Sequence, residues 1–224
     1  FDTGEVFCAG WQGSGEKGDG GTNNGYYTKR VGRTNNNGGG FDYNQQIQTY
    51  QGSKSQRGQG LMIDIQAIKI GTSNEGDYAN NSSSVMGALD INGQLWTWGY
   101  NGHSGLGRNF RYNNNWYDSY VPSKIPQQVF DNRKIRDFWL GGGNYQQGHA
   151  LDEDGNLWGW GYNGYGALGL GDDQYQGQPR KVPYDFNRHG GIKKIIKAGY
   201  NSYIITAVLT PVSYTHLTLP TSYP

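Results

Sequence analysis

The sequence predicts an all-β protein built by repetition of a four-stranded antiparallel unit. Three observations indicate this fold class: a Trp-rich phrase recurs along the chain, Asn-Gly and Asp-Gly pairs separate short apolar runs, and many glycines occur together with many aromatic rings. The chain has 224 residues, of which 38 are Gly, 18 Tyr and 7 Trp. Disordered chains are poor in aromatic residues, so this composition indicates strands joined by many turns.

The recurring phrase is Gly-Asn-Leu-Trp-Gly-Trp-Gly-Tyr-Asn-Gly over residues 155–164. It copies Gly-Gln-Leu-Trp-Thr-Trp-Gly-Tyr-Asn-Gly over residues 93–102, and a more divergent copy begins at Gly4. Such self-similarity indicates a supersecondary unit that builds its core by stacking copies.

Each complete copy begins at a tight hairpin. Asn-Gly at residues 92–93 and Asp-Gly at residues 154–155 lie between apolar arms. Such pairs predict a type I′ turn, because that turn requires a positive φ at both central residues. The following arm is Leu95–Trp98 in one copy and Leu157–Trp160 in the other. Its apolar side chains occur at both odd and even positions, which predicts a central strand that is covered on both faces.

Two further strands complete each unit. Runs rich in β-branched residues precede the hairpins at residues 65–71, 135–141 and 192–199. Runs containing proline follow the central strand at residues 121–126 and 179–183. Proline lacks a backbone donor, so it favours an edge strand. Each unit therefore has four strands.

The whole pattern resembles a known family. In order, it reads Ile-x-x-Ile-x-x-Gly, Ala-Leu, Gly-x-Leu-Trp-x-Trp-Gly-x-Asn-x-x-Gly-x-Leu-Gly and Pro-x-x-Val. This is similar to the regulator of chromosome condensation repeat, whose superfamily includes β-lactamase inhibitory protein II and forms β-propellers. The resemblance implies a β-propeller fragment of about three four-stranded antiparallel blades, with an incomplete ring.

We expect residues 1–210 to contain the blades. One is partial at 1–31, two are complete at 61–126 and 133–184, and another starts at 190–209.

The remaining segments are not expected to belong to blades. Residues 32–60 contain few apolar side chains and are expected to be an insertion between blades, because they cannot offset the entropy of ordering. Residues 212–221 resemble a translated sequencing-library adapter, so residues 211–224 are expected to be a scar rather than native sequence. The chain starts at Phe1 without Met, which also indicates a fragment and leaves a preceding signal peptide open.

Charge and residue types argue against several classes of function. The 19 basic and 18 acidic side chains give a formal charge of +1, which provides no broad footprint for nucleic acid. No apolar run approaches the roughly 20 residues of a membrane-spanning helix. Cys8 is the single cysteine, so it forms no internal disulfide. We expect no nucleic-acid partner and no membrane insertion.

No catalytic residue, metal site or cofactor is expected. Residues 13–18 and 164–169 match Gly-x-Gly-x-x-Gly, but no helical pattern follows, so these glycines are interpreted as turn residues. Residues 152–155 resemble the start of a calcium loop but lack its downstream Glu, which favours a hairpin. No cysteine or nucleophile elbow accompanies the histidines His103, His149 and His189.

The candidate partner-binding residues are aromatic side chains in the long loops. If the four strands alternate in direction, residues 72–84, 110–120, 141–148 and 171–178 emerge on one face of the ring, which we call the long-loop face. Tyr, Trp and Asn supply rigid contact area and adaptable hydrogen bonds in recognition surfaces. The candidates are Tyr78, Tyr112, Trp116, Tyr117, Tyr145 and Tyr175.

Alternatives stay open for these rings. They can instead cover the blade ends and hold glycine-rich loops in place. As a binding surface, they suggest a non-enzymatic interaction module with a protein or glycan partner. The alternative is a microbial or viral surface adhesin that binds carbohydrate, outside the cell or on a virion. An enzyme or exchange factor would require clustered acids or a charged wedge, and neither pattern is found.

Overall fold

The computed structural model describes nearly two thirds of the chain. The described residues are 4, 6–10, 15–16, 18, 25–31, 64–71, 84–109, 111–112, 115–116, 118–141, 145–200 and 203–211. The expected insertion at 32–60 and the adapter-like segment at 212–221 lie outside these ranges.

Two four-stranded antiparallel sheets form the centre of the described structure. The first has the order β3-β4-β5-β8 and the second β12-β11-β10-β9. Their bounds are β3 Ile65–Gly71, β4 Val85–Asp90, β5 Leu95–Gly99, β8 Ser119–Lys124, β9 Ile135–Gly141, β10 Gln147–Asp152, β11 Leu157–Gly161 and β12 Gln176–Lys181. The proline-containing strands β8 and β12 are edge strands, as the sequence predicts.

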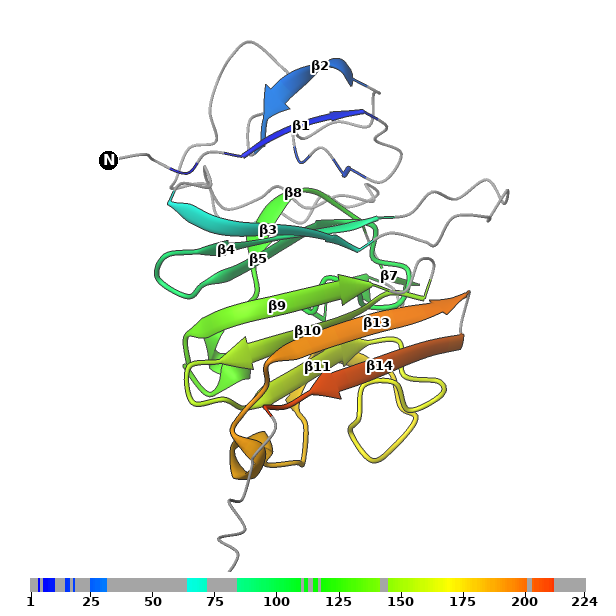
Figure 1. Ribbon diagram of the computed structural model, residues 1–224. Coiled ribbons are helices and arrows are strands. Elements are labelled where there is room, and N and C mark those ends of the chain that lie inside the picture. The colour runs from blue at the N-terminus through cyan, green and yellow to red at the C-terminus, as the bar shows by residue number, and fades with distance from the viewer. Residues whose placement is uncertain are drawn as a thin grey trace, which may run out of the picture.

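Three smaller sheets and two 3₁₀ helices complete the description. The two-stranded sheets are β1 Phe7–Gly10 with β2 Gly25–Arg30, β6 Arg111–Tyr112 with β7 Asn115–Trp116, and β13 Lys194–Tyr200 with β14 Tyr203–Leu209. The 3₁₀ helices Gln127–Phe130 and Phe186–His189 each connect one large sheet to the next sheet along the chain. Figure 1 shows the succession from β1 and β2 at the top to β13 and β14 below, and the described sheets do not close into a ring.

The hairpin turns differ from the expected type. Gly93 has a φ of 78°, but Asn92 is not among the residues with positive φ. The Gly93 N–H donates to the Asp90 carbonyl at 3.0 Å, and the Asp90 N–H donates to the Gln94 carbonyl at 3.1 Å. The type I′ prediction is therefore wrong: a tight turn is followed by one left-handed glycine, the usual alternative for short hairpins. The hairpin at residues 152–156 repeats the arrangement.

A buried aspartate explains this turn. Asp152 Oδ1 accepts hydrogen bonds from the backbone N–H groups of Asp154 and Asn156 at 3.0 and 2.8 Å. Its Oδ2 accepts from Trp158 Nε1 at 2.9 Å. Asp90 bonds Trp96 in the same way at 3.2 Å. Each carboxylate thus holds both the turn and the first Trp of the central strand.

The core lies between successive sheets rather than at one centre. Trp96 and Trp98 pack with Val6 and Val31 of the preceding sheet, and Trp158 and Trp160 pack with Leu89, Leu95 and Phe138. A third cluster joins β11 to the β13–β14 sheet through Leu157, Ile195 and Val208. Strands β4, β5, β10 and β11 are buried along their whole length, as both-face coverage requires.

The second Trp of each phrase ties its sheet to the preceding one. Trp98 Nε1 donates to the Glu16 carbonyl at 2.8 Å, and Trp160 Nε1 donates to the Gly105 carbonyl at 2.9 Å. Two residues beyond each acceptor is a left-handed glycine, Gly18 or Gly107, whose Cα position leaves no room for a side chain beside the indole. The repeated phrase is therefore a device for stacking sheets.

The β13–β14 sheet is covered on one face only. Ile195 and Val208 face the preceding sheet and belong to the core. On the opposite face, Ile196, Ile205 and Leu209 are 50%, 70% and 50% exposed. An apolar sheet face of this kind agrees with a propeller whose ring is not closed.

Candidate recognition site

The structure brings two of the six predicted residues, Tyr145 and Tyr175, into one aromatic cluster. The ring centroids of Tyr162 lie 4.7 Å from Tyr145 and 5.0 Å from Tyr175. His103 lies 4.6 Å from Tyr145 and 6.0 Å from Tyr175, and Tyr165 lies 6.4 Å from Tyr162. We call these five residues the aromatic cluster. Offset and edge-on ring contacts of this kind are stabilising.

The other four candidates cannot be placed in this cluster. Tyr78 and Tyr117 lie outside the described residues. Tyr112 and Trp116 lie on the paired strands β6 and β7, between β5 and β8, and only their backbone is described.

Buried asparagines hold the loops that carry the cluster. Asn163 is fully buried; its Oδ1 accepts from the Leu168 N–H at 3.0 Å, and its Nδ2 donates to the Asp172 carbonyl at 2.8 Å. Asn101 occupies the same position one repeat earlier. Its Oδ1 accepts from the Leu106 N–H at 3.1 Å, and its own N–H donates to Asp118 Oδ1 at 2.9 Å. Each asparagine thus links the end of a central strand to the loop beyond it.

A glycine after each asparagine allows the neighbouring tyrosine to fold over the turn. A Cβ at Gly164 would lie 2.4 Å from the Tyr162 hydroxyl, and one at Gly102 would lie 2.0 Å from the Tyr100 hydroxyl. Any side chain there would displace the tyrosine ring. The Tyr-Asn-Gly sequence is therefore a local device that sets the position of the ring at the centre of the cluster.

The loop that carries Tyr175 is braced by Asp172. This carboxylate accepts hydrogen bonds from the Arg180 guanidinium and from the Gln174 N–H, and these bonds lower the pKa of Asp172. Asp172 also bonds Asn163 at 3.2 Å, which joins the loop to the cluster. Tyr175 is 47% exposed and Tyr165 58% exposed, whereas Tyr162, which contacts both rings, is only 6% exposed.

Carboxylates border the cluster on two sides. Burial, the charge of Asp118 and the nearby Tyr145 raise the pKa of the Tyr100 phenol, so Asp118 lies close to that end. Asp172 and the exposed Asp173 precede Tyr175 in its loop by three and two residues. The site therefore combines ring faces with negative charge.

Sequence reasoning missed His103, Tyr162 and Tyr165. The signal was present, because Tyr100 and Tyr162 occupy the same column of the repeat, as do His103 and Tyr165. Both columns lie just after the Trp-x-Trp-Gly phrase in the shared repeat, outside the long loops from which the candidates were chosen. In the structure, the central strands end at Gly99 and Gly161, and the tyrosine that follows each glycine lies outside the strand.

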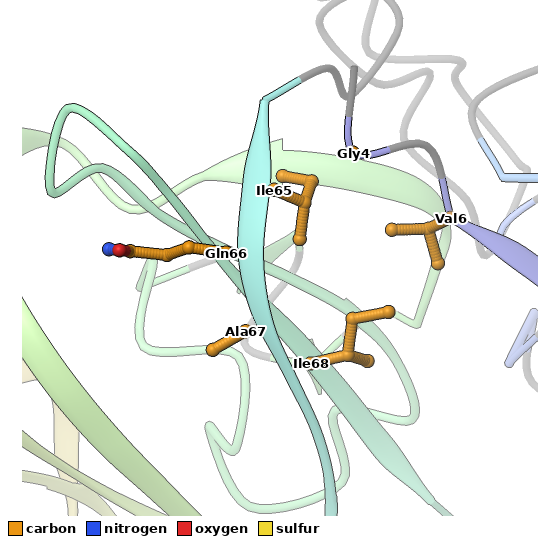
Figure 2. Close-up of a pocket in the computed structure, with 6 residues that line it drawn as sticks. All are labelled: Gly4, Val6, Ile65, Gln66, Ala67 and Ile68. Carbon is orange, nitrogen blue, oxygen red and sulfur yellow. The ribbon is translucent and has the colours of Figure 1, made fainter. Parts of the chain in front are cut away.

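A separate hollow of about 290 Å³ lies between strand β3 and the N-terminal residues Gly4 and Val6. Its lining residues are Gly4, Val6 and residues 65–68 of β3. Figure 2 shows Val6, Ile65 and Ile68 pointing toward one another, while Gln66 and Ala67 project from the other side of the strand. An irregularity in the pairing between Ile65 and Ala67 places both isoleucines on one side. The lining includes no titratable side chain, so the hollow offers no acid–base chemistry.

The described residues contain no group of three or more His, Cys, Asp or Glu side chains that could hold a metal ion. Within the same part of the chain, no helix is long and apolar enough to cross a membrane.

Comparison with known proteins agrees with the repeat pattern. Residues 154–204 match the model of the Regulator of chromosome condensation (RCC1) repeat. The chain is 34% identical over 131 residues to the Ultraviolet-B receptor UVR8 of Arabidopsis thaliana, and the match covers 58% of this chain and 26% of the receptor. The chain thus spans well under half of the length of this curated relative.

Two solved structures show weaker overall similarity. Yeast RCC1 (Prp20), in its crystal structure with Kap60, is 22% identical with a TM-score of 0.42, covering 58% of this chain and 27% of that one. Human WBSCR16 is 19% identical with a TM-score of 0.45, covering 93% of this chain and 54% of that one. Residues 154–204 therefore carry an RCC1 repeat, and the four-stranded sheets with their repeated Trp contacts resemble the blades of such repeat proteins.

Proposed function

We propose that this chain is a non-enzymatic binding module that recognises a protein through its long-loop face. The aromatic cluster carries the proposal, because it presents large rings at the surface on loops that are held by buried hydrogen bonds. Rigid aromatic side chains lose little conformational freedom on binding, so pre-organised rings of this kind make effective anchors. Central aromatic residues are also enriched among the residues that dominate binding energy.

The alternative, that the rings only cover the blade ends and hold the loops in place, accounts for only part of the cluster. Tyr162, which is almost fully buried, covers the end of its blade. Tyr165 and Tyr175 leave about half of their surface exposed to solvent, which a purely structural cover does not require. This division supports a recognition role for the outer rings and a supporting role for the inner one.

The blade boundaries belong to the same proposal. Residues 61–126 and 133–184 are proposed as two complete blades, since each contains one four-stranded sheet. Residues 1–31 and 190–209 are proposed as parts of blades, because each contains a two-stranded sheet.

A peptide-display selection tests the binding function without assuming a partner. Random linear peptides are selected on the wild-type chain, and the affinities of recovered peptides are measured for Tyr175→Ala and Tyr145→Ala. Tyr184→Ala is the matched control, because Tyr184 is 53% exposed but stacks on His189 away from the cluster. We expect roughly tenfold weaker binding to the two cluster variants and unchanged binding to the control.

Two outcomes would overturn the proposal: the selection recovers no peptide, or the recovered peptides bind all three variants equally well. Circular dichroism of each variant checks that the fold is retained. Binding of glycans on an array, lost in Tyr175→Ala, would favour the carbohydrate-binding alternative instead.

A further inference from the structure

We propose that the partner segment is basic and places an arginine side chain on the exposed ring of Tyr175, beside Asp173. This inference rests on the proposed binding function and specifies the chemistry of the partner. Three features lead to it: the excess of acidic residues in the loops, the presence among them of one carboxylate without an ion pair in the described part of the chain, and the contacts that this chain already makes between cations and rings.

Acidic residues are concentrated in the four loops that the sequence assigns to the long-loop face. Those four loops contain five carboxylates and one basic residue, although the whole chain has 19 basic and 18 acidic side chains. The carboxylates are spread over three of the loops rather than gathered in one place: Glu75, Asp77, Asp118, Asp172 and Asp173. A face with this balance attracts cationic partners and repels nucleic acid and acidic peptides.

Asp173 supplies the available charge. Asp172 next to it is already paired with Arg180. Asp173 is exposed, its carboxylate accepts from Gln174 Nε2 at 2.7 Å, and no ion pair involves it within the described part of the chain. A cation over Tyr175 would therefore have available, two residues away in the sequence, a carboxylate that forms no ion pair with any described residue.

The chain shows elsewhere that its ring faces accept cations. Lys69 Nζ lies 4.7 Å from the ring centre of Trp139, and Lys124 Nζ lies 4.9 Å from that of Trp96. No lysine or arginine among the described residues lies over Tyr145 or Tyr175. The negative face of an aromatic ring attracts cations, and this attraction is stronger where the cation also meets a carboxylate.

Arginine fits this arrangement better than lysine. Its planar guanidinium can stack on a tyrosine ring and, with its edge, donate two parallel hydrogen bonds to a carboxylate. The compact, strongly hydrated ammonium of lysine can satisfy only one of these contacts well. The partner segment is therefore expected to discriminate between the two cations.

Four synthetic peptides test the inference by fluorescence polarisation. They share one length and a Gly-Ser background, and carry Arg, Lys, citrulline or Glu at the same alternating positions. Citrulline keeps the shape of arginine but has no charge. We expect the Arg peptide to bind at least about tenfold more tightly than the citrulline peptide and more tightly than the Lys peptide, with no binding of the Glu peptide.

Matched variants locate the binding site. Tyr175→Ala is expected to lower the affinity for the Arg peptide by about tenfold. Asp173→Asn should lower the affinity by about threefold and make it less dependent on salt, because one charge–charge contact that salt screens is lost. The controls Tyr184→Ala and Glu153→Gln, which change an exposed ring and an exposed carboxylate away from the cluster, should bind as the wild type does.

Equal binding of the Arg and citrulline peptides, or unchanged binding of the Arg peptide to Tyr175→Ala, would overturn the inference. The two proposals fail separately. If display-selected peptides lose affinity for Tyr175→Ala but carry no basic residues, the basic partner is wrong and the binding function stands. If neither peptide set depends on the cluster, both are wrong.

Discussion

Lys197 makes the stability of this protein depend on pH in a direction that can be measured. The residue lies on β13 and extends into the contact with the preceding sheet, where its Nζ donates to Gln147 Oε1 at 3.2 Å. A Cβ at Gly141 would lie 3.3 Å from its Cδ, so the side chain packs closely against that backbone. Burial lowers the pKa of Lys197 from 10.5 to about 7.

The sign and size of the effect follow from proton linkage. Between pH 7 and 10.5 the unfolded chain holds a proton on Lys197 that the folded protein has released, so stability rises with pH in this window. Below pH 7 both states become charged, and the dependence on this group fades. Linkage with these pKa values gives an increase of about 2 kcal/mol in the free energy of unfolding between pH 7 and pH 9.

Lys197→Met removes the titrating group and keeps most of the apolar stem. Urea unfolding at pH 7, 8 and 9 is compared for the wild type, Lys197→Met and the exposed control Lys193→Met. We expect Lys197→Met to be more stable than the wild type at pH 7. We also expect it to lack the increase of about 2 kcal/mol in the free energy of unfolding between pH 7 and pH 9. Burial lowers the pKa of Arg108 to about 9, so Arg108 also titrates near the top of this range, but it is present in all three proteins and its contribution cancels in the comparison.

The reasoning is refuted if Lys197→Met keeps the same slope of stability against pH as the wild type. It is also refuted if Lys193→Met removes the slope, because then a solvent-exposed charge and not a buried one would be responsible.

Three further predictions concern the stacking of the sheets and are tested by urea unfolding. Trp160→Ala should destabilise by about 3–5 kcal/mol, because a core cavity opens and the bond to the Gly105 carbonyl is lost, and a loss below about 1 kcal/mol would contradict this. Asp152→Ala should destabilise by at least about 2 kcal/mol, since the turn N–H groups and the Trp158 indole lose their common acceptor; an unchanged midpoint would show that the carboxylate does not hold the hairpin. Gly107→Ala should cost clearly more than the roughly 1–2 kcal/mol of its left-handed φ alone, because the new Cβ would lie 2.9 Å from Trp160. Gly171→Ala, at φ 84° with nothing within 4 Å, supplies the reference, and equal losses would argue against the close contact.

Much of the fold could be predicted because its signals are local. The proline at residue 122 indicated an edge strand, and the apolar run Leu157–Trp160 indicated a central one; both strands lie where expected. The turn type was wrong for a physical reason that the Asn-Gly pair does not reveal. The side chain of Asp90 supplies the acceptor for two N–H groups of the turn, and this favours a backbone with one left-handed residue rather than two.

The candidate site was predicted less completely, because its members come from different sheets. Tyr145 and Tyr175 were recognised as loop aromatics, but nothing near them in the sequence indicates His103 or Tyr162 as neighbours. Those contacts depend on the conformation of each loop. Hydrogen bonds of the buried Asn101 and Asn163 to Asp118 and Asp172 stabilise that conformation.

The sequence by itself determined the repeated strands, the edge prolines and the Trp phrase that stacks one sheet on the next. These features follow from the alternation of side chains along a strand and from the conformations that glycine and proline allow. Only the tertiary structure decided that His103, from the loop after β5, packs on Tyr145 and Tyr175, which flank the next sheet's central strands. Packing of sheet against sheet brings these rings together, and the spacing between sheets is a property of the whole core rather than of any short segment.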